Sequence, residues 1–304
     1  MGKVAFVFPG QGAQYPGMGK SLCDASPAAA HIFELADSIR PGTSHQCFEG
    51  TDEELKQTAI TQPCLWTVEM AAAAALNEAG IRADVCAGFS LGELAALSFA
   101  HVVDTSTCFD LVCRRGQLMQ EAAETVDTAM AAVVKLDNET VESICTLFDG
   151  VYPVNYNCPG QVTVAGLKTS MADFSAAVKE AKGRALPLRV SGGFHSPFMT
   201  GASEAFATYL EDVEFHNPII PVYANKTALP YGNNMKQTLA SQICSPVRWE
   251  DIIRNMIDAG VDTFVEVGPG NALQGFIARI DKNVRTFGVS DAESLKKTIE
   301  EVHA

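Results

Sequence analysis

The sequence has few basic residues for its length. Its 304 residues include 22 Lys and Arg against 36 Asp and Glu, which gives a net charge of −14 at pH 7. A protein that binds nucleic acid through the phosphates needs an excess of cations to displace counterions. The charge balance therefore speaks against nucleic acid as a partner.

Several other signals are missing as well. No run of residues is long and apolar enough to span a membrane, and the chain enters a strand at Lys3 without a signal peptide. The nine cysteines form no C-x-x-C pair, and an odd number does not suit a disulfide framework. We therefore expect a protein of the reducing cytoplasm with no membrane partner, no metal and no cofactor.

The chain has ample material for a large interior. Apolar residues make up 47% of it, and 304 residues suit one α/β domain or one domain with an insertion. Residues 130–190 stand out because strands and helices follow the order β-α-β-β-α-β, that of a ferredoxin-like unit. We therefore predict a catalytic α/β domain of residues 1–128 and 191–304 and a ferredoxin-like subdomain of residues 129–190.

Helices and strands were assigned from apolar periodicity and capping residues. We predict a helix from Pro63 to Ala79, ended by Gly80, and a strand from Ile219 to Ala224. Further helices are predicted over residues 91–100, 105–124, 138–148, 170–182, 198–210, 247–259 and 272–280. Further strands are predicted over residues 3–8, 130–135, 151–155, 162–165, 185–190, 263–267 and 285–289.

Ser90 is the first candidate for chemistry. It is the centre of Gly88-Phe89-Ser90-Leu91-Gly92, which follows an apolar strand and opens a helix. Glycines on both sides allow a sharp turn that exposes the hydroxyl at the positive end of the helix. The pattern predicts a nucleophile elbow and therefore acyl chemistry.

A serine nucleophile needs a base and a site for the developing negative charge. His195 is the best base among six histidines, because it ends a glycine-rich loop just before a helix. No carboxylate after it stands out as its partner, so a backbone carbonyl is expected to orient its ring. The N–H of Leu91 and one N–H from the loop at residues 9–14 are expected to bind the oxyanion.

Arg115 lies inside a predicted long helix. A buried arginine is costly unless it meets an anion. If it points toward Ser90, it would hold an acyl group that carries its own carboxylate. A surface position on the helix is the alternative.

These pieces occur in order along nearly the whole chain. The markers are Phe8-Pro9-Gly10-Gln11-Gly12-Ala13-Gln14, Gly88-Phe89-Ser90-Leu91-Gly92-Glu93, Arg115-Gly116 with Met119-Gln120, Asn155-Tyr156-Asn157-Cys158-Pro159-Gly160-Gln161, Phe194-His195-Ser196-Pro197, Ser245-Pro246-Val247-Arg248-Trp249 and Glu266-Val267-Gly268-Pro269-Gly270. With them the chain resembles malonyl-CoA:acyl carrier protein transacylases of bacterial type II fatty acid synthesis. It is also similar to acyltransferase domains of polyketide synthases.

The resemblance implies an α/β-hydrolase-like core with a ferredoxin-like insert. It also implies that Ser90 is the acylated nucleophile, His195 the general base and acid, and Arg115 the ligand of the malonyl carboxylate. The backbone N–H groups of Gln11 and Leu91 would form the oxyanion hole.

Two further roles follow from the resemblance. The backbone carbonyl of Arg248 would orient His195, and Asn157 would line the substrate pocket. The chain departs from the family at Phe89, where most members have His, and at Cys158, where Ser is common. Phe194 is similar to malonyl-selective members, in which an aromatic ring leaves little room for an α-methyl group.

The function that the resemblance implies is ping-pong transfer of a malonyl group from malonyl-CoA to the phosphopantetheine thiol of an acyl carrier protein. A trans-acting acyltransferase of a polyketide synthase and an acyl hydrolase remain open as alternatives. We expect a monomer. Basic residues of the insert are candidates for docking the acidic carrier, namely Lys179, Lys182, Arg184 and Arg189.

Overall fold

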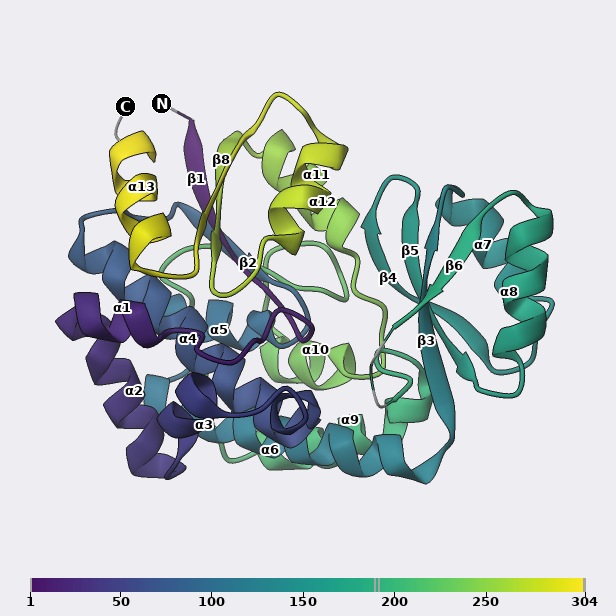
Figure 1. The fold of residues 1–304 in the computed structure, drawn as a ribbon, viewed down its shortest axis with the longest axis horizontal. Helices are drawn as coiled ribbons and strands as arrows, with labels where there is room; N and C mark the ends of the chain where they lie inside the picture. Colours follow the sequence, from purple (N-terminus) through teal and green to yellow (C-terminus); the bar gives the residue numbers. More distant parts are fainter. Residues whose placement is uncertain (1, 189, 191, 303–304) are drawn as a thin grey trace.

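The protein is built on two separate β-sheets (Figure 1). The computed structural model describes residues 2–188, 190 and 192–302. The larger sheet has five parallel strands in the order β7-β2-β1-β8-β9. In that order they are β7 (Val222–Tyr223), β2 (Val85–Gly88), β1 (Lys3–Phe8), β8 (Val261–Val267) and β9 (Arg285–Val289).

Helices cover both faces of the parallel sheet. Successive side chains of a strand point to opposite faces. Phe6 and Phe8 of β1 therefore lie in one core with residues of α4 and α5, while Ala5 and Val7 lie in another with residues of α11 and α12. A parallel sheet covered in this way leaves the carboxyl ends of its strands as the place for a site.

The helices follow in chain order. They are α1 (Lys20–Ala25), α2 (Pro27–Ile39), α3 (Thr43–Glu49), α4 (Thr58–Glu78), α5 (Gly92–Phe99), α6 (Thr105–Thr125), α7 (Asn138–Cys145), α8 (Met171–Glu180), α9 (Thr200–Leu210), α10 (Met235–Gln242), α11 (Trp249–Asp258), α12 (Ala272–Ile280) and α13 (Ala292–Val302), with short 3-10 turns at Glu54–Lys56 and Pro197–Met199.

The smaller sheet is antiparallel and lies to one side of the parallel sheet, with α7 and α8 against it (Figure 1). Its strands, in the order β4-β5-β3-β6, are β4 (Val151–Cys158), β5 (Gln161–Leu167), β3 (Thr128–Val134) and β6 (Arg184–Pro187). Along the chain the order is β-α-β-β-α-β, as predicted. One docking candidate, Arg189, lies outside the described residues.

Several predicted boundaries were wrong: α7 ends at Cys145 instead of 148, β4 continues to Cys158 instead of 155, and β6 ends at Pro187 instead of 190. Two others have a physical reason. Helix α4 begins at Thr58 and continues through Pro63, which was expected to start it. Proline removes one helical hydrogen bond, but α4 is buried along most of its length, and such packing outweighs a local breaker. Strand β7 was predicted over 219–224 but is limited to Val222–Tyr223, because only these two residues pair with β2, at Cys86 and Ala87.

None of the described helices is long and apolar enough to cross a membrane. All nine cysteines are free, and six of them are buried. A buried thiol behaves as a small apolar side chain, which accounts for their positions in apolar runs.

Candidate active site

Ser90 occupies the sharp turn between β2 and α5. Its φ is 54°, a left-handed backbone that a residue with a side chain rarely adopts. The turn is this tight because Gly88 and Gly92 touch backbone directly. A Cβ on Gly88 would lie 1.8 Å from the carbonyl carbon of Gly92, and one on Gly92 would lie 2.3 Å from the carbonyl oxygen of Phe8. The predicted elbow is therefore present.

His195 faces Ser90, with 2.6 Å between His195 Nε2 and Ser90 Oγ. The histidine also has a left-handed backbone, with φ of 61°. The end of α10 holds it twice. The His195 N–H donates to the Ile243 carbonyl at 3.1 Å, and Nδ1 donates to the Gln242 carbonyl at 2.9 Å. With its proton on Nδ1, the neutral ring leaves Nε2 free to accept the Ser90 hydroxyl proton.

The carbonyl that orients His195 is therefore not that of Arg248, as the resemblance implied, but that of Gln242. Arg248 directly precedes α11 as its N-cap, and its carbonyl accepts the N–H of Ile252 in the first helical turn. Its side chain is turned to solvent and pairs with Asp251 at 2.8 Å. The carbonyl of Gln242 is available because it lies at the end of α10, where the last carbonyls have no partner within the helix.

Arg115 points from α6 toward Ser90 and is fully buried. Its Nη2 donates to Ser90 Oγ at 3.3 Å and to Gln242 Oε1 at 2.8 Å. Its Nη1 donates to Gln62 Oε1 at 2.8 Å, and its Nε has no partner within the described residues. The surface alternative is thus wrong, and a cation lies beside the candidate nucleophile.

Burial sets the charge states here. It lowers the pKa of His195 to about 4, and the positive charge of Arg115 acts in the same direction. Burial also lowers the pKa of Arg115 to about 10, against the opposing effect of the Glu93 charge. At neutral pH the ring is therefore neutral and able to accept a proton, while the guanidinium remains charged.

A cleft of about 360 Å³ is lined by Phe89, the residue that directly precedes Ser90. Asn157, for which the resemblance implied a place in the substrate pocket, lines it, and so does Gln11, for which the resemblance implied a backbone N–H in the oxyanion hole. Strands β1 and β2 are neighbours, so the loop that carries Gln11 lies beside the turn that carries Leu91. Leu91 directly precedes α5, where backbone N–H groups lack helical partners. These two segments can therefore provide N–H groups at one place.

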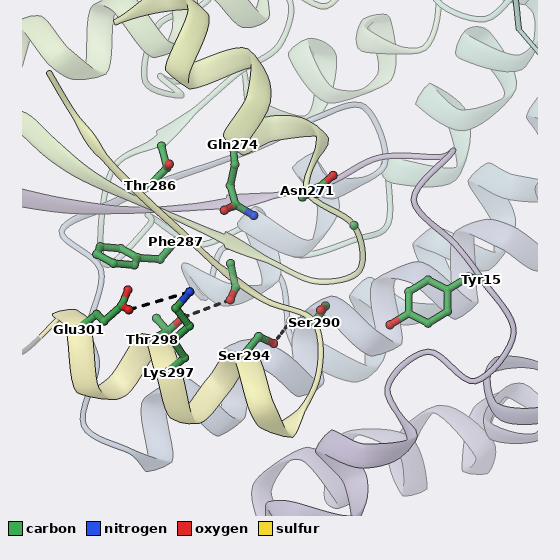
Figure 2. A pocket seen from close by; sticks show the side chains of 12 residues that line it. Tyr15, Asn271, Gln274, Thr286, Phe287, Ser290, Ser294, Lys297, Thr298 and Glu301 are labelled. Carbon is green, nitrogen blue, oxygen red and sulfur yellow. Dashed lines mark hydrogen bonds and ion pairs between the residues drawn. The ribbon is translucent and has the colours of Figure 1, made fainter. Parts of the chain in front are cut away.

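A second hollow, of about 530 Å³, adjoins this cleft at Gly270 and Asn271. Figure 2 shows it between the loop that carries Tyr15 and the side chains of α13. It is mostly polar, and among the residues drawn the one ion pair joins Lys297 and Glu301, at 4.0 Å, along α13. None of the predicted site residues lines it, whereas Gln11 and Asn157 line the cleft of about 360 Å³, so its size does not make it the site.

The structure also places Phe89 and Cys158, where the sequence departs from the family that it resembles, and Phe194, which is similar to its malonyl-selective members. Phe89 lines the cleft and lies edge-on against Trp249, with 5.5 Å between ring centroids, and 6.5 Å from the ring of Phe276. Phe194 is buried, and Cys158 is buried with its sulfur 3.8 Å from an Arg279 nitrogen. Phe89 thus gives the cleft one aromatic wall.

Sequence reasoning missed the polar side chains that hold the reacting ones. Asn225 accepts the Ser90 N–H at 2.7 Å and donates to the Gly88 carbonyl at 2.6 Å. Gln242 Nε2 donates to the Ser90 carbonyl at 2.6 Å and to Glu93 Oε2 at 2.9 Å. Of these residues, only Glu93 stood inside a motif. The others lie in segments without a pattern that identifies them.

A serine at a strand-to-helix turn, hydrogen-bonded to a histidine whose other nitrogen is fixed, is typical of enzymes that form acyl-serine intermediates. The fold and the site thus define the class as acyl-transfer enzymes. The chain belongs to the acyl transferase domain family, which matches residues 5–302.

Individual relatives are similar over nearly the full length. The malonyl CoA-acyl carrier protein transacylase of Bacillus subtilis is 38% identical, over 99% of this chain and 97% of its own. That of Haemophilus influenzae is 37% identical, over 97% of each chain.

Solved structures agree with this. The crystal structure of malonyl CoA-acyl carrier protein transacylase from Clostridium perfringens superposes with a TM-score of 0.96 at 34% identity, covering 99% of this chain and 97% of that one. A malonyl-transacylase in complex with its type II PKS acyl-carrier protein has a TM-score of 0.95 at 36% identity, covering 98% and 99%.

Proposed function

We propose that this protein transfers a malonyl group from malonyl-CoA to the phosphopantetheine thiol of an acyl carrier protein. The observation that carries the proposal is the fully buried Arg115 guanidinium, 3.3 Å from Ser90 Oγ. An acyl group bound to Ser90 would have its far end near this cation. A carboxylate there would bind the guanidinium through charge-assisted hydrogen bonds, which a plain acyl chain cannot form.

The first half-reaction acylates Ser90. The hydroxyl proton moves to Nε2 of His195 while Oγ bonds to the thioester carbon. The N–H groups of Gln11 and Leu91 bind the resulting oxyanion. The carbon–sulfur bond then breaks, and the imidazolium returns the proton to the leaving CoA thiolate.

The second half-reaction runs the same steps in reverse with another thiol. The carrier's phosphopantetheine thiol gives its proton to His195, and its sulfur bonds to the malonyl carbon. The bond to Ser90 Oγ breaks, and His195 returns the proton to that oxygen. One thioester replaces another, so the overall reaction is nearly balanced and reversible. The proposed steps require no cofactor, because the side chains of the site move every proton.

The imidazolium must be stabilised without a carboxylate against its Nδ1. The end of α10 can supply this, because the carbonyl end of a helix carries partial negative charge. The Gln242 carbonyl that accepts from Nδ1 belongs to that end. A neutral carbonyl makes His195 a weaker base than a carboxylate would, which suits thioesters because their thiolate leaves readily.

The carrier protein as partner is supported by the names of the relatives and by the neighbour solved with its acyl-carrier protein. The latter, a type II PKS protein, keeps a polyketide pathway open beside fatty acid synthesis. We also propose that the larger part is an α/β-hydrolase-like core and that residues 129–190 form a ferredoxin-like subdomain. A monomer in the cytoplasm remains our prediction.

An acyl hydrolase is the competing function. Simple acyl hydrolases have no use for a buried cation beside the nucleophile, so Arg115 argues against it. Intact-protein mass spectrometry separates the two, using malonyl-CoA first and then a phosphopantetheinylated carrier protein. We expect a malonyl adduct on Ser90 that moves to the carrier. An adduct lost to water with the carrier unmodified would establish the hydrolase, and no adduct at all would refute both.

A further inference from the structure

Gln242 contacts each of the reacting groups of the site. Its Oε1 accepts from Arg115, its Nε2 donates to the Ser90 carbonyl, and its own backbone carbonyl accepts from His195. A rotation of this amide would therefore disturb Arg115 and the Ser90 backbone together, while His195 is held by the backbone of the same residue. Misplacement of about 1 Å can cost ~10²-fold in rate, so whatever fixes Gln242 matters for catalysis.

The amide of Gln242 has one correct orientation. Its oxygen meets the Arg115 guanidinium, which only donates, and its nitrogen meets Glu93 Oε2 at 2.9 Å. A flipped amide would place donors against Arg115 and an oxygen against the carboxylate. The cation at one end and the anion at the other therefore both select the observed orientation.

Hydrogen bonds hold the carboxyl group of Glu93 in place. It is fully buried in the first turn of α5, three residues after Ser90. Its Oε1 accepts from the Tyr231 hydroxyl, and its Oε2 accepts from the Asn225 N–H at 3.3 Å as well as from Gln242. Taking a carboxyl group out of water costs free energy that an apolar side chain in the same place would not cost. The stability of the fold is therefore a poor reason for this carboxyl group to be here.

We propose that Glu93 is a positioning residue: held by Tyr231, it fixes the amide of Gln242 and through it the geometry of Ser90 and Arg115, beside the His195 ring that the backbone carbonyl of Gln242 orients. The carboxyl group thus acts at one remove from the histidine. This inference rests on the proposed function, because it takes Ser90 and His195 as the reacting groups.

Because Glu93 can take up a proton, its positioning role predicts that the reactivity of Ser90 depends on pH. Burial raises the pKa of Glu93 to about 7, although the Tyr231 hydroxyl, Gln242, Asn225 and Arg115 all lower it. As the carboxylate takes up a proton it becomes a weaker acceptor for the Gln242 amide. Reactivity of Ser90 should therefore fall as the pH drops through about 7.

Other titratable groups near Glu93 do not reproduce this signature. Helix α5 packs against β1, β2, α4 and α6. Arg115 from α6 and Tyr231 face the carboxyl group, and both titrate well above neutral pH. The thiols of Cys86 on β2 and Cys108 on α6 contact the α5 backbone, and burial raises the pKa of each.

A matched control is available on α4. Glu69 is also a fully buried glutamate, but both its oxygens lack a partner within the described residues, and it faces Glu266 instead of Gln242. Glu69→Gln changes the same chemistry in an equally buried place outside the network. Its effect measures what a buried carboxyl-to-amide change does by itself.

The test uses a fluorophosphonate, which phosphonylates an activated serine as fluoride leaves and so reports on Ser90 without malonyl-CoA. Wild type, Glu93→Gln, Tyr231→Phe and Glu69→Gln are each labelled between pH 5 and 9, and intact mass gives the rate. We expect Glu93→Gln to lower the labelling rate about 30-fold and to lose the step near pH 7. Glu69→Gln should label like wild type and keep the step.

Tyr231→Phe keeps the carboxyl group and decides the matter if Glu93→Gln does not fold. It removes a hydrogen bond that lowers the pKa of Glu93, so the step should move to higher pH. A purely structural role would not move it. An unchanged step in this variant, or labelling of folded Glu93→Gln within about twofold of wild type, would overturn the proposal. Failure of the proposed function is a different result: wild type labels normally, but malonyl-CoA leaves no adduct.

Discussion

The two turns that carry the reacting atoms have similar backbones but are specified in different ways. Ser90 and His195 both adopt a left-handed φ, of 54° and 61°. The turn at Ser90 is local, because Gly88 and Gly92 permit contacts that no side chain could allow. The turn at His195 is held from afar, by hydrogen bonds to Gln242 and Ile243 about 47 residues later. The glycines that permit the first turn can be recognised in a sequence, whereas the distant carbonyls that hold the second cannot.

Removing the histidine should give the largest effect. In His195→Ala the Ser90 proton has no acceptor, so the rate of malonyl-Ser90 formation should fall about 10³-fold, within the range of general-base catalysis. Some stability should be lost as well, because the ring is buried and its removal leaves the Gln242 carbonyl without this partner. Rapid-quench mass spectrometry measures the rate and thermal unfolding the stability. A variant that acylates within tenfold of wild type would remove His195 from the proposed mechanism.

Altering the turn at Ser90 should instead damage the fold. In Gly92→Ala the new methyl group would lie 2.3 Å from the Phe8 carbonyl oxygen and 2.5 Å from that of Pro9. Overpacking against backbone should cost about 3 kcal/mol in the free energy of unfolding, measured in urea. Gly275→Ala is the matched control. Nothing lies within 4 Å of its Cβ inside α12, so it should leave stability unchanged or slightly raised.

These differences show why the sequence was informative about one half of the site. The elbow at Ser90, its histidine and the arginine at 115 lie in recognisable motifs, and the structure brings all three together. Arg248 was the wrong carbonyl. Helix α10, which carries Gln242, is eight residues long and polar, without a side-chain cap or a clear apolar face, so no pattern predicts it.

The same reason applies to the fold. The long buried helices and the strand pairs with regular periodicity were predicted nearly at their observed ends, as for α12 and β9. Pro63 was wrongly expected to start a helix, because local rules contain no information about how deeply α4 is buried. Contacts between distant segments decide such positions, and one sequence does not contain them.

Arg115 lies between the two turns and should separate binding from reactivity. Arg115→Ala removes the cation but leaves Ser90 and His195, so malonyl-Ser90 formation should fall about 10²-fold while acetyl-CoA is spared. Parallel acylation assays with the two thioesters measure the ratio. Equal losses for both would show that Arg115 supports the reacting groups and does not select the carboxylate.

Protonation of His195 and protonation of Glu93 should change the free energy of unfolding in opposite directions. Burial lowers the pKa of His195 to about 4, so from pH 6.5 down to 4 only the unfolded state takes up its proton, and stability is lost as the pH falls. Glu93, next to the other turn, has a pKa raised to about 7 and acts oppositely: its contribution is lost as the pH rises from 4.5 to 7.

Urea unfolding across this pH range separates the two groups. Relative to wild type, His195→Gln should lose stability as the pH rises, and Glu93→Gln should gain it, each by at most about 1.4 kcal/mol per pH unit. Differences of the same sign would contradict the assigned pKa directions.

Phe89, beside the nucleophile, should give the smallest effect. Its ring lines the cleft and packs against Trp249 and Phe276. Phe89→His keeps a ring but reduces the apolar contact, which is worth about 1 kcal/mol, so KM should rise a few-fold for malonyl-CoA and for the carrier alike. Phe89→Leu, which stays apolar, should change KM less. Because the ring does not touch the reacting atoms, kcat should hold; a fall in kcat at constant KM would instead assign Phe89 to the turn that positions Ser90.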